Sequence, residues 1–334
     1  MDITKLDQFK SRKILVIGDY CIDKFYYGEP RAISPEAPII RNVGNKNTVK
    51  INPGMAGNIV AGINALGAKC YAVGVVGEDD DASRILINFF NKNKINTEGL
   101  IPQKNRATPE FIRIVSGGAK YPSQQVIRHD VENTELMNDS ISEQICNFIQ
   151  DKLENEKGFD AIVVADYNEF GEGIIDENIL NKLRKISNNA GIISVGDSRK
   201  NFHNFHNFTC IKPNIYEAMQ LCGKNKISAD ELAGQIMQDL NLKTILLTKD
   251  KEGMYLMTNS GTKRDFPAYA KKVIDVTGAG DSVTSAFTLA LASGFSCEDS
   301  AQLASYAAAI SVSKPGVSTV SLEELKQFAL ENER

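Results

Sequence analysis

The chain has 334 residues, of which 42% are hydrophobic, and a formal net charge of −4. This length suits one large α/β domain or two smaller ones, and the weakly acidic balance excludes bulk attraction to nucleic acid or to an anionic membrane. No apolar run approaches the ~20 residues that span a bilayer, and the N-terminus lacks a signal-peptide pattern. The six cysteines are scattered and contain no Cys-x-x-Cys pair. We therefore expect a reduced cytoplasmic protein without a disulfide framework or zinc site.

Strand and helix patterns alternate along most of the chain. Residues 13–19 form a short apolar run ended by Gly18, which is typical of a buried parallel strand. Further strands are expected at 70–77, 159–166, 191–197, 209–212, 244–248, 253–257 and 263–268. Helices are expected at 54–66, 81–93, 140–156, 175–188, 214–222, 228–240, 281–293, 297–313 and 321–332. This alternation predicts an α/β fold with a doubly wound, mostly parallel sheet, which binds ligands at the carboxyl ends of its strands.

Two segments interrupt the alternation. Residues 20–53 are rich in Pro, Gly and charge, and residues 106–130 have an irregular β pattern. We expect them to pair as a small second sheet that acts as a lid. The chain is therefore predicted to be a single domain over 1–334, with the lid segments inserted in it.

The most informative stretch is Asp275-Val-Thr-Gly-Ala-Gly-Asp281, which runs into a helical pattern of small and apolar residues. Gly278, Ala279 and Gly280 therefore lie at a helix start, where free backbone N–H groups and the helix dipole form an anion site. The Asp281 carboxylate beside it suits a base that accepts a proton from a hydroxyl attacking a phosphate. The structural alternative is that the glycines allow close packing and that Asp281 is a first-turn partner of the dipole.

With Thr277 before it and the Gly/Ala/Ser-rich helix after it, this string resembles the C-terminal signature of the ribokinase-like (PfkB) sugar kinases. The resemblance implies that Asp281 is the catalytic base and that the amides of Gly278, Ala279 and Gly280 form an anion hole for the transferred phosphoryl group. It also implies ATP and Mg²⁺ as cofactors, with Gly278 and Gly280 near the nucleotide.

Two motifs near the lid fit the sugar side of such a site. Asp19 and Asp23 flank the end of the first strand, where carboxylates suit a polyol, although a solvated loop is an equal alternative. Pro53-Gly-Met-Ala-Gly-Asn58 resembles the family's Gly-Gly-x-x-x-Asn, with Pro53 in place of the first Gly. The resemblance implies that Asp19, Asp23, Gly54 and Asn58 bind sugar oxygens, while a plain helix cap remains the alternative for the second motif.

Two motifs fit the nucleotide side. Asn214 and Glu217 match the family's Asn-x-x-Glu, which implies that Asn214 contacts the nucleotide and that Glu217 holds Mg²⁺ through water, since this ion takes few direct protein ligands. The same pair fits an N-cap and capping box, and both roles can hold at once. The family also places its nucleotide near the turn from Thr248 to Gly253, for which a surface hairpin is the alternative.

Competing motifs are weaker. His203 and His206 lie in a segment with three Phe residues, which we interpret as a loop with aromatic anchors, because a metal site needs a third ligand. Residues 62–69 resemble a Walker loop, but Ala68 separates Gly from Lys and no Ser or Thr follows. The first strand also lacks the glycine fingerprint of dinucleotide-binding sheets.

Four further strings resemble one branch of the family, the bacterial D-glycero-D-manno-heptose-7-phosphate kinases, which make lipopolysaccharide precursors. They are Arg31-Ala-Ile-Ser-Pro-Glu-Ala-Pro38, Ile127-Arg-His-Asp130, Ala165-Asp-Tyr-Asn-Glu-Phe-Gly171 and Lys314-Pro-Gly-Val-Ser-Thr-Val320. The resemblance covers roughly 13–322 and implies heptose 7-phosphate as the acceptor, phosphorylated at O1. Bifunctional relatives carry a second, nucleotidyltransferase domain; the chain ends before one fits, so we expect adenylylation elsewhere.

One departure from this branch concerns the charge that a phosphorylated sugar needs at its far end. The branch's Thr-Lys-x-Arg is Glu110-Phe-Ile-Arg113 here, so Arg113 is kept and the Lys becomes Phe111. Arg113, Arg128 and Arg31 are the remaining candidates for that charge.

The sequence therefore predicts an ATP- and Mg²⁺-dependent kinase for a small-molecule sugar or sugar phosphate. By the resemblance we also expect a monovalent cation near the 314–320 turn and a homodimer paired through the lid, with no nucleic-acid or membrane partner. Two alternatives stay open. One is a kinase of the same fold for fructose, a fructose phosphate, ribose or a nucleoside, and the other is a catalytically silent regulator that binds sugar or nucleotide.

Overall fold

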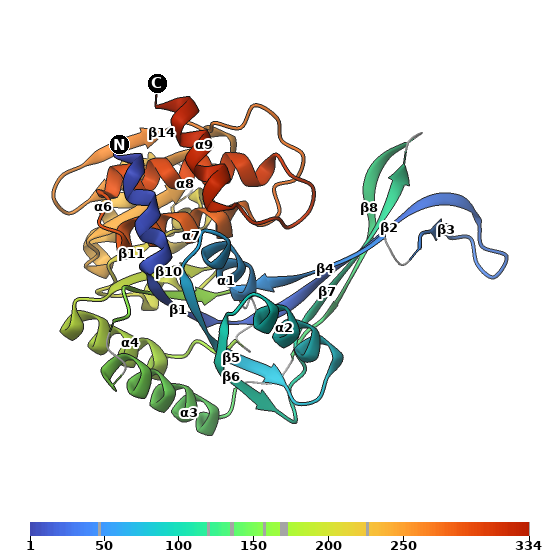
Figure 1. Ribbon diagram of the computed structural model, residues 1–334, viewed down its shortest axis with the longest axis horizontal. Coiled ribbons are helices and arrows are strands. Elements are labelled where there is room, and N and C mark those ends of the chain that lie inside the picture. The colour runs from blue at the N-terminus through green and yellow to red at the C-terminus, as the bar shows by residue number, and fades with distance from the viewer. Residues whose placement is uncertain are drawn as a thin grey trace.

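The computed structural model describes residues 1–45, 48–118, 121–133, 137–155, 158–167, 173–224 and 227–333. Its body is built on a nine-stranded sheet, and a long β arm projects from one side of that body (Figure 1). The two termini lie close together at the end of the body that is remote from the arm. Within the described residues, no helix is both long and apolar enough to cross a membrane.

The main sheet has the strand order β14-β13-β12-β11-β10-β9-β1-β5-β6. Its strands are β1 (Lys13–Gly18), β5 (Lys69–Gly77), β6 (Asn96–Gln103), β9 (Ala161–Asp166), β10 (Ile193–Ser198), β11 (Cys210–Ile211), β12 (Thr244–Thr248), β13 (Met254–Thr258) and β14 (Lys263–Phe266). Neighbours from β6 to β12 pair in parallel, and β13 and β14 add an antiparallel edge. The expected doubly wound, mostly parallel sheet is confirmed.

Helices cover both faces of this sheet. One face carries α1 (Ala56–Ala65), α2 (Asp81–Lys92), α7 (Ala279–Ala292), α8 (Cys297–Val312) and α9 (Leu322–Asn332), together with a 3₁₀ segment at Ile3–Ser11. The other carries α3 (Asp139–Gln150), α4 (Glu177–Ala190), α5 (Ile215–Cys222) and α6 (Ala229–Leu240). Alternate side chains of β1 enter the two cores: Ile14 and Val16 face the first layer, and Leu15 and Ile17 the second.

Two of the differences from the expectation bear on the sheet and on the site. Strand β6 was not predicted, because Gly99 and Pro102 interrupt its apolar pattern; it lies at the edge of the sheet, where both residues are tolerated. Helix α7 begins at Ala279 rather than Asp281, because Gly278 takes the left-handed conformation (φ 80°) and serves as its N-cap.

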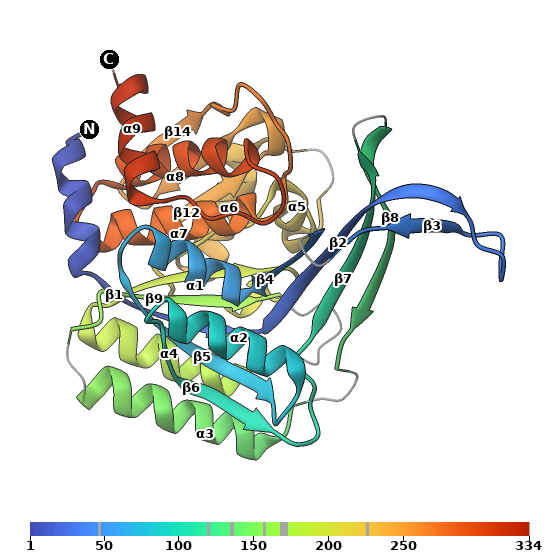
Figure 2. The same cartoon turned by 45° about the vertical axis from the view of Figure 1, so that its right-hand side comes forward.

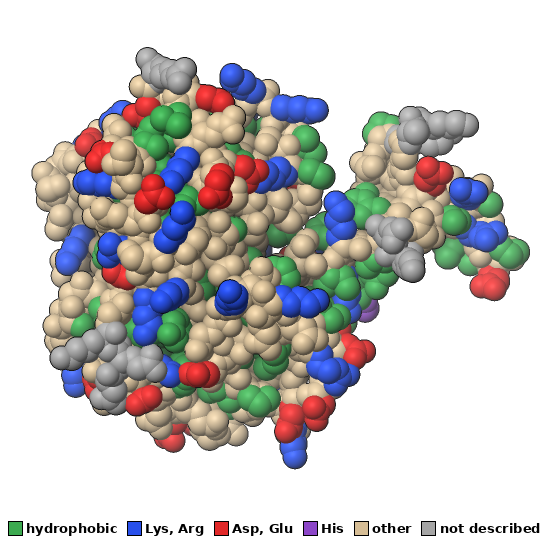
Figure 3. All heavy atoms as spheres, viewed as in Figure 1, with side chains coloured by type: hydrophobic (Ala, Val, Ile, Leu, Met, Phe, Trp, Pro, Cys, Tyr) green, Lys and Arg blue, Asp and Glu red, His purple; other side chains and the backbone are tan. Residues whose placement is uncertain are grey.

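The two lid segments pair with each other. The strands are β2 (Tyr20–Ile33), β3 (Ile40–Val43), β4 (Val49–Met55), β7 (Glu110–Gly118) and β8 (Tyr121–Val131), in the order β3-β2-β7-β8. Strand β4 pairs with the first half of β2, and β3 pairs with the second half. Figure 2 shows that the arm starts against α1 and α2 and extends well beyond the body. The space-filling view shows apolar side chains along this arm (Figure 3). Those with more than half of their surface exposed are Ile33, Ile39, Ile40, Val126 and Ile127.

Candidate active site

The site forms where the first turns of α1 and α7 meet. The two helices pack closely, since a Cβ added to Gly62 of α1 would lie 2.6 Å from the Ser285 hydroxyl of α7. That hydroxyl lies 3.2 Å from the Ile59 carbonyl of α1 and 2.7 Å from the Asp281 carbonyl of its own helix. The contact places the start of α7, with Asp281 in its first turn, against the start of α1.

Both carboxylate oxygens of Asp281 accept hydrogen bonds. The Asn58 amide nitrogen donates to Oδ2 at 2.6 Å, and the Tyr167 hydroxyl lies 2.9 Å from Oδ1. Burial raises the pKa of Asp281 to about 6; the nearby Asp197 also raises it, whereas the bonds from Asn58 and Tyr167 oppose the rise. A carboxylate oxygen accepts more than one hydrogen bond, so Asp281 retains capacity for a substrate hydroxyl.

Behind Asp281 lies a buried ion pair. One oxygen of Asp197, Oδ2, lies 2.7 Å from the Tyr167 hydroxyl, 2.7 Å from the Thr284 hydroxyl and 3.1 Å from the Lys212 ammonium. Burial alone would lower the pKa of Lys212, but Asp197 and then Glu217 outweigh it, so the pKa is raised and the ammonium stays charged.

A cradle for an anion adjoins this ion pair. A Cβ added to Gly280 would lie 3.6 Å from the Lys212 Nζ, so the ammonium stands beside the N-terminus of α7. Gly278 has a positive φ, and a Cβ there would lie 2.6 Å from the Asn58 amide. A helix N-terminus combined with an ammonium suits phosphate oxygens. The Ala279 amide was expected to contribute to the anion hole. It already donates to the Val276 carbonyl at 3.2 Å, in the turn that leads into the helix, so it is not free for an anion.

A second group of predicted residues meets at the base of the arm. Asp23 of β2 forms a buried ion pair with Arg113 of β7. A Cβ on Gly54 would lie 2.5 Å from an oxygen of Asp23, so this close approach requires glycine. Burial raises the pKa of Asp23, and Arg113 opposes that rise. The guanidinium groups of Arg113 and Arg128 lie 5.9 and 4.9 Å from the ring centre of Phe111, a cation–π arrangement.

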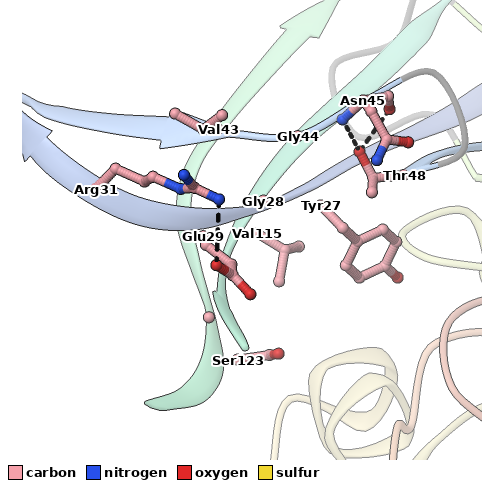
Figure 4. A pocket seen from close by; sticks show the side chains of 11 residues that line it. Tyr27, Gly28, Glu29, Arg31, Val43, Gly44, Asn45, Thr48, Val115 and Ser123 are labelled. Carbon is pink, nitrogen blue, oxygen red and sulfur yellow. Dashed lines mark hydrogen bonds and ion pairs between the residues drawn. The ribbon is translucent and has the colours of Figure 1, made fainter. Parts of the chain in front are cut away.

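The remaining sugar-side candidates separate in space. The Asp19 carboxylate accepts a hydrogen bond from the Ile174 N–H at 2.9 Å. The backbone carbonyl of Asp19 accepts one from the Ala56 N–H at the start of α1, at 3.0 Å. Arg31 lies instead on the arm, where Figure 4 shows it pointing at Glu29, 3.9 Å away, in a pocket of about 350 Å³. The structure therefore does not bring Arg31 together with Arg113 at the base of the arm.

Asp23 and Asp281 belong to one neighbourhood. The buried thiol of Cys21 has its pKa raised first by burial and then by the charges of Asp23, Asp281 and Asp19. The sugar-side residues and the proposed base thus lie within electrostatic reach of the same thiol.

The nucleotide-side candidates lie at the ends of β11 and β12. Asn214 is the N-cap of α5, and its N–H donates to Glu217 at 2.7 Å, so the capping box expected as the structural alternative is present. Thr248 forms a β-bridge with Asn214. Burial raises the pKa of Glu217, and Lys212 opposes the rise. Gly253 has φ 90° in the β12–β13 hairpin, where a Cβ would overlap the Phe266 carbonyl. The nucleotide and Mg²⁺ roles remain predictions.

Sequence reasoning assigned no role to Tyr167, Asp197 or Lys212, which complete the network around Asp281. Their positions carried a usable signal, because each follows or ends a strand of the parallel sheet, where ligand sites form. Of the string at 165–171, residues 168–171 lie outside the described part of the chain.

Comparison with known proteins places these features in a family. The model of the pfkB family carbohydrate kinases matches residues 12–325. A protein of Desulfatibacillum aliphaticivorans named bifunctional protein HldE is 34% identical over 322 residues, which are 95% of this chain and 63% of that protein. A protein of the same name from Sulfurimonas denitrificans is 32% identical and is matched over 64% of its length. The chain thus spans a little under two thirds of these relatives.

Solved structures share the fold. Phosphofructokinase-2 from Escherichia coli in complex with potassium superposes with a TM-score of 0.78 at 18% identity, covering 97% of this chain and 99% of that one. Ribokinase from Arabidopsis thaliana complexed with ribose and ATP gives 0.69 at 20% identity, covering 95% and 98%. At these identities the likeness concerns the ribokinase-like fold alone.

Proposed function

Because the chain belongs to the pfkB family of carbohydrate kinases and is a sugar kinase, we propose that it phosphorylates D-glycero-D-manno-heptose 7-phosphate at O1 with ATP, and that Asp281 is the general base. The observation that carries the mechanism is the Asp281 carboxylate, held by Asn58 and Tyr167 at the N-terminus of α7 beside the buried Lys212. The heptose assignment rests on the four sequence strings and on the relatives named HldE.

In this mechanism the acceptor hydroxyl hydrogen-bonds to Asp281, which takes its proton as the oxygen attacks phosphorus. A phosphoryl-transfer transition state is loose, so little proton transfer is needed early and a carboxylate with a pKa of about 6 is basic enough. Tyr167 and Asn58 fix the carboxylate in place, which removes the entropic cost of orienting it during the reaction.

We assign the phosphoryl oxygens to the amides of Gly278 and Gly280 and to the Lys212 ammonium, which stands beside Gly280. Groups that the fold already holds at the start of α7 stabilise charge on the moving phosphoryl group without reorganising. ATP supplies that phosphoryl group when bound. Glu217 is the proposed holder of Mg²⁺ through water, and Asn214, Thr248 and Gly253 are the proposed nucleotide neighbours.

The sugar end of the site is assigned to the base of the arm. Asp19, Asp23, Gly54 and Asn58 would meet the hydroxyls, and Arg113 and Arg128 would meet the phosphate of the acceptor. Both guanidinium groups lie near the Phe111 ring, with Arg113 paired to Asp23 and Arg128 paired to Asp130. Two cations at this place support the assignment, although the Lys of the heptose-kinase pattern is absent.

We further propose a homodimer paired through the arm, whose exposed apolar side chains are unusual for a free surface. Light scattering tests this, and a monomer contradicts it.

A cytoplasmic location fits the six free cysteines. A monovalent cation is proposed near the 314–320 turn, where the Gly316 N–H donates to Asp275 at 3.1 Å, and turnover in potassium against a large organic cation tests it.

The experiment that tests the proposed function is ADP release with Mg·ATP against a panel of acceptors. The panel contains heptose 7-phosphate, sedoheptulose 7-phosphate, fructose phosphates, free hexoses, ribose and nucleosides, with Asp281→Asn as the inactive control. Turnover on heptose 7-phosphate alone, with the new phosphate at O1 by ³¹P NMR, is the expected result. Turnover only on another sugar would keep the mechanism and reject the substrate, and binding without any turnover would favour a regulator.

A further inference from the structure

Tyr167 occupies an unusual position between two carboxylates. Its hydroxyl oxygen lies 2.9 Å from Oδ1 of Asp281 and 2.7 Å from Oδ2 of Asp197. A phenol carries one proton, so at any moment it donates to one carboxylate only. Two ionised carboxylates on one phenol oxygen would leave one contact without a proton, which is costly in a buried site.

The two carboxylates are not equivalent. The Oδ2 of Asp197 also receives the Lys212 ammonium at 3.1 Å and the Thr284 hydroxyl at 2.7 Å, whereas Asp281 has neither contact in the structure. Asp281 is the carboxylate whose pKa is raised to about 6, first by burial, with Asn58 and Tyr167 opposing that effect. The protonation state of Asp281 therefore changes near neutral pH.

We propose that Tyr167 is a positioning residue that satisfies Asp281 in both of its protonation states. When Asp281 is ionised, the Tyr167 hydroxyl donates to its Oδ1. When Asp281 has taken the proton of the acceptor, the protonated carboxyl donates a hydrogen bond to the phenol oxygen. The Tyr167 hydroxyl then donates its own hydrogen bond to Asp197. No proton is gained or lost by the tyrosine, and Asp197 keeps the Lys212 ammonium and the Thr284 hydroxyl in both states. The base can therefore be loaded and reset without leaving an unpaired polar group.

This inference rests on the proposed function, in which Asp281 accepts the proton of the acceptor. The charged and polar groups around Asp281 come from five elements. They are the Cys21 thiol of β2, Asn58 of α1, Tyr167 after β9, Asp197 of β10 and Lys212 after β11, with Glu217 of α5 acting on Lys212. Of these, only Tyr167 bonds to both carboxylates and can act as donor and acceptor.

The test uses Tyr167→Phe, which removes one oxygen and keeps the ring. The bond to the ionised carboxylate is charge-assisted and is stronger than the bond to the protonated one, so its loss should move the acid limb of the kcat profile to higher pH by about half a unit to one unit. The kcat at pH 8 should fall about three- to tenfold, while KM for ATP stays within about twofold. Asp197→Asn removes a neighbouring negative charge, so it should move the same limb to lower pH.

Tyr255→Phe is the matched control. Its hydroxyl also bonds to a carboxylate, Asp230, at 2.7 Å, but on β13 and away from Asp281. This variant should keep the wild-type pH profile. If Tyr167→Phe behaves like Tyr255→Phe, or if it and Asp197→Asn shift the limb in the same direction, the proposal is overturned.

A second readout does not need turnover. Carboxyl ¹³C NMR of aspartate-labelled protein, with the Asp281 signal assigned by its loss in Asp281→Asn, reports the pKa of Asp281 directly. An upward shift in Tyr167→Phe supports the inference, and an unchanged pKa overturns it. If the wild type phosphorylates no acceptor, the proposed function fails, and the NMR result alone still decides whether Tyr167 controls Asp281.

Discussion

The Asn58 amide donates to the Asp281 carboxylate at 2.6 Å, although 223 residues separate the two in the sequence. Asn58 lies in the first turn of α1, the helix after the lid strand β4, and Asp281 lies in the first turn of α7, the helix that follows the glycine turn near the C-terminus. The bond therefore joins the proposed sugar side of the site to the proposed phosphoryl side. It follows that the position of the proposed base depends on how the lid segment enters the body.

Replacing Asp281 by Asn should abolish turnover without abolishing binding. Loss of a general base typically costs about 10²- to 10⁴-fold in rate, while the anion cradle at Gly278, Gly280 and Lys212 is unchanged. ADP release should therefore fall by that factor, and calorimetry should find a similar Kd for ATP. Activity within about tenfold of wild type would show that Asp281 is not the base.

The same substitution should stabilise the protein at high pH. The Asp281 pKa is about 6 in the folded state and 3.8 in its unperturbed state, so folding favours the protonated form. This contribution is fully present below pH ~4 and is lost as the pH rises through 6, by at most about 3 kcal/mol at 1.36 kcal/mol per unit. The free energy of unfolding of Asp281→Asn, measured with denaturant, should thus exceed that of the wild type at pH 8 and equal it at pH 4. Equal stability at both values would contradict the raised pKa.

The activity of the wild type should depend on the protonation state of Asp281. Asp281 must be ionised to accept a proton, so kcat should be level above pH ~7 and fall about tenfold per unit well below pH 6. A pH series of ADP release at saturating substrate measures this limb. A limb that persists in the residual activity of Asp281→Asn would belong to another group.

Arg128→Ala tests whether the acceptor carries a phosphate. The Arg128 guanidinium is partly exposed beside Phe111, so its loss should raise KM for a sugar phosphate about tenfold or more and leave KM for ATP unchanged. Phe111→Lys, which restores the cation of the heptose-kinase pattern, should lower the sugar-phosphate KM. Arg84→Ala, which removes an exposed ion pair with Asp81 on α2, is the control. An unchanged KM in Arg128→Ala would argue for an unphosphorylated acceptor.

Gly54→Ala should damage the site through one methyl group. The added Cβ would lie 2.5 Å from Asp23 and from the Cys21 sulfur, so Asp23 must move or the backbone must shift, at a cost of about 1–3 kcal/mol. Gly234→Ala on α6 is matched to it: nothing lies within 4 Å of its Cβ, and it should stabilise the helix by about 0.5–1 kcal/mol. Thermal unfolding compares the two, and a neutral Gly54→Ala would contradict the tight packing.

The sequence predicted the alternating elements well because their signals are local. Buried strands such as β9 are continuous apolar runs, and helices such as α6 carry their own caps. The sequence did not predict β6, because Gly99 and Pro102 interrupt its apolar pattern. This strand forms because β5 provides its hydrogen-bond partners. That partnership is a property of the sheet and leaves no local pattern.

The amino-acid sequence alone determined the fold class, the two lid segments and the glycine turn that starts the helix of Asp281, because each follows from residue type and spacing within a few tens of residues. Only the tertiary structure decided the surroundings of that carboxylate. Tyr167, Asp197 and Lys212 come from three different strand ends, and they meet because parallel strands bring their carboxyl ends to one edge. The same packing desolvates Asp281, so its raised pKa is a consequence of the assembled fold.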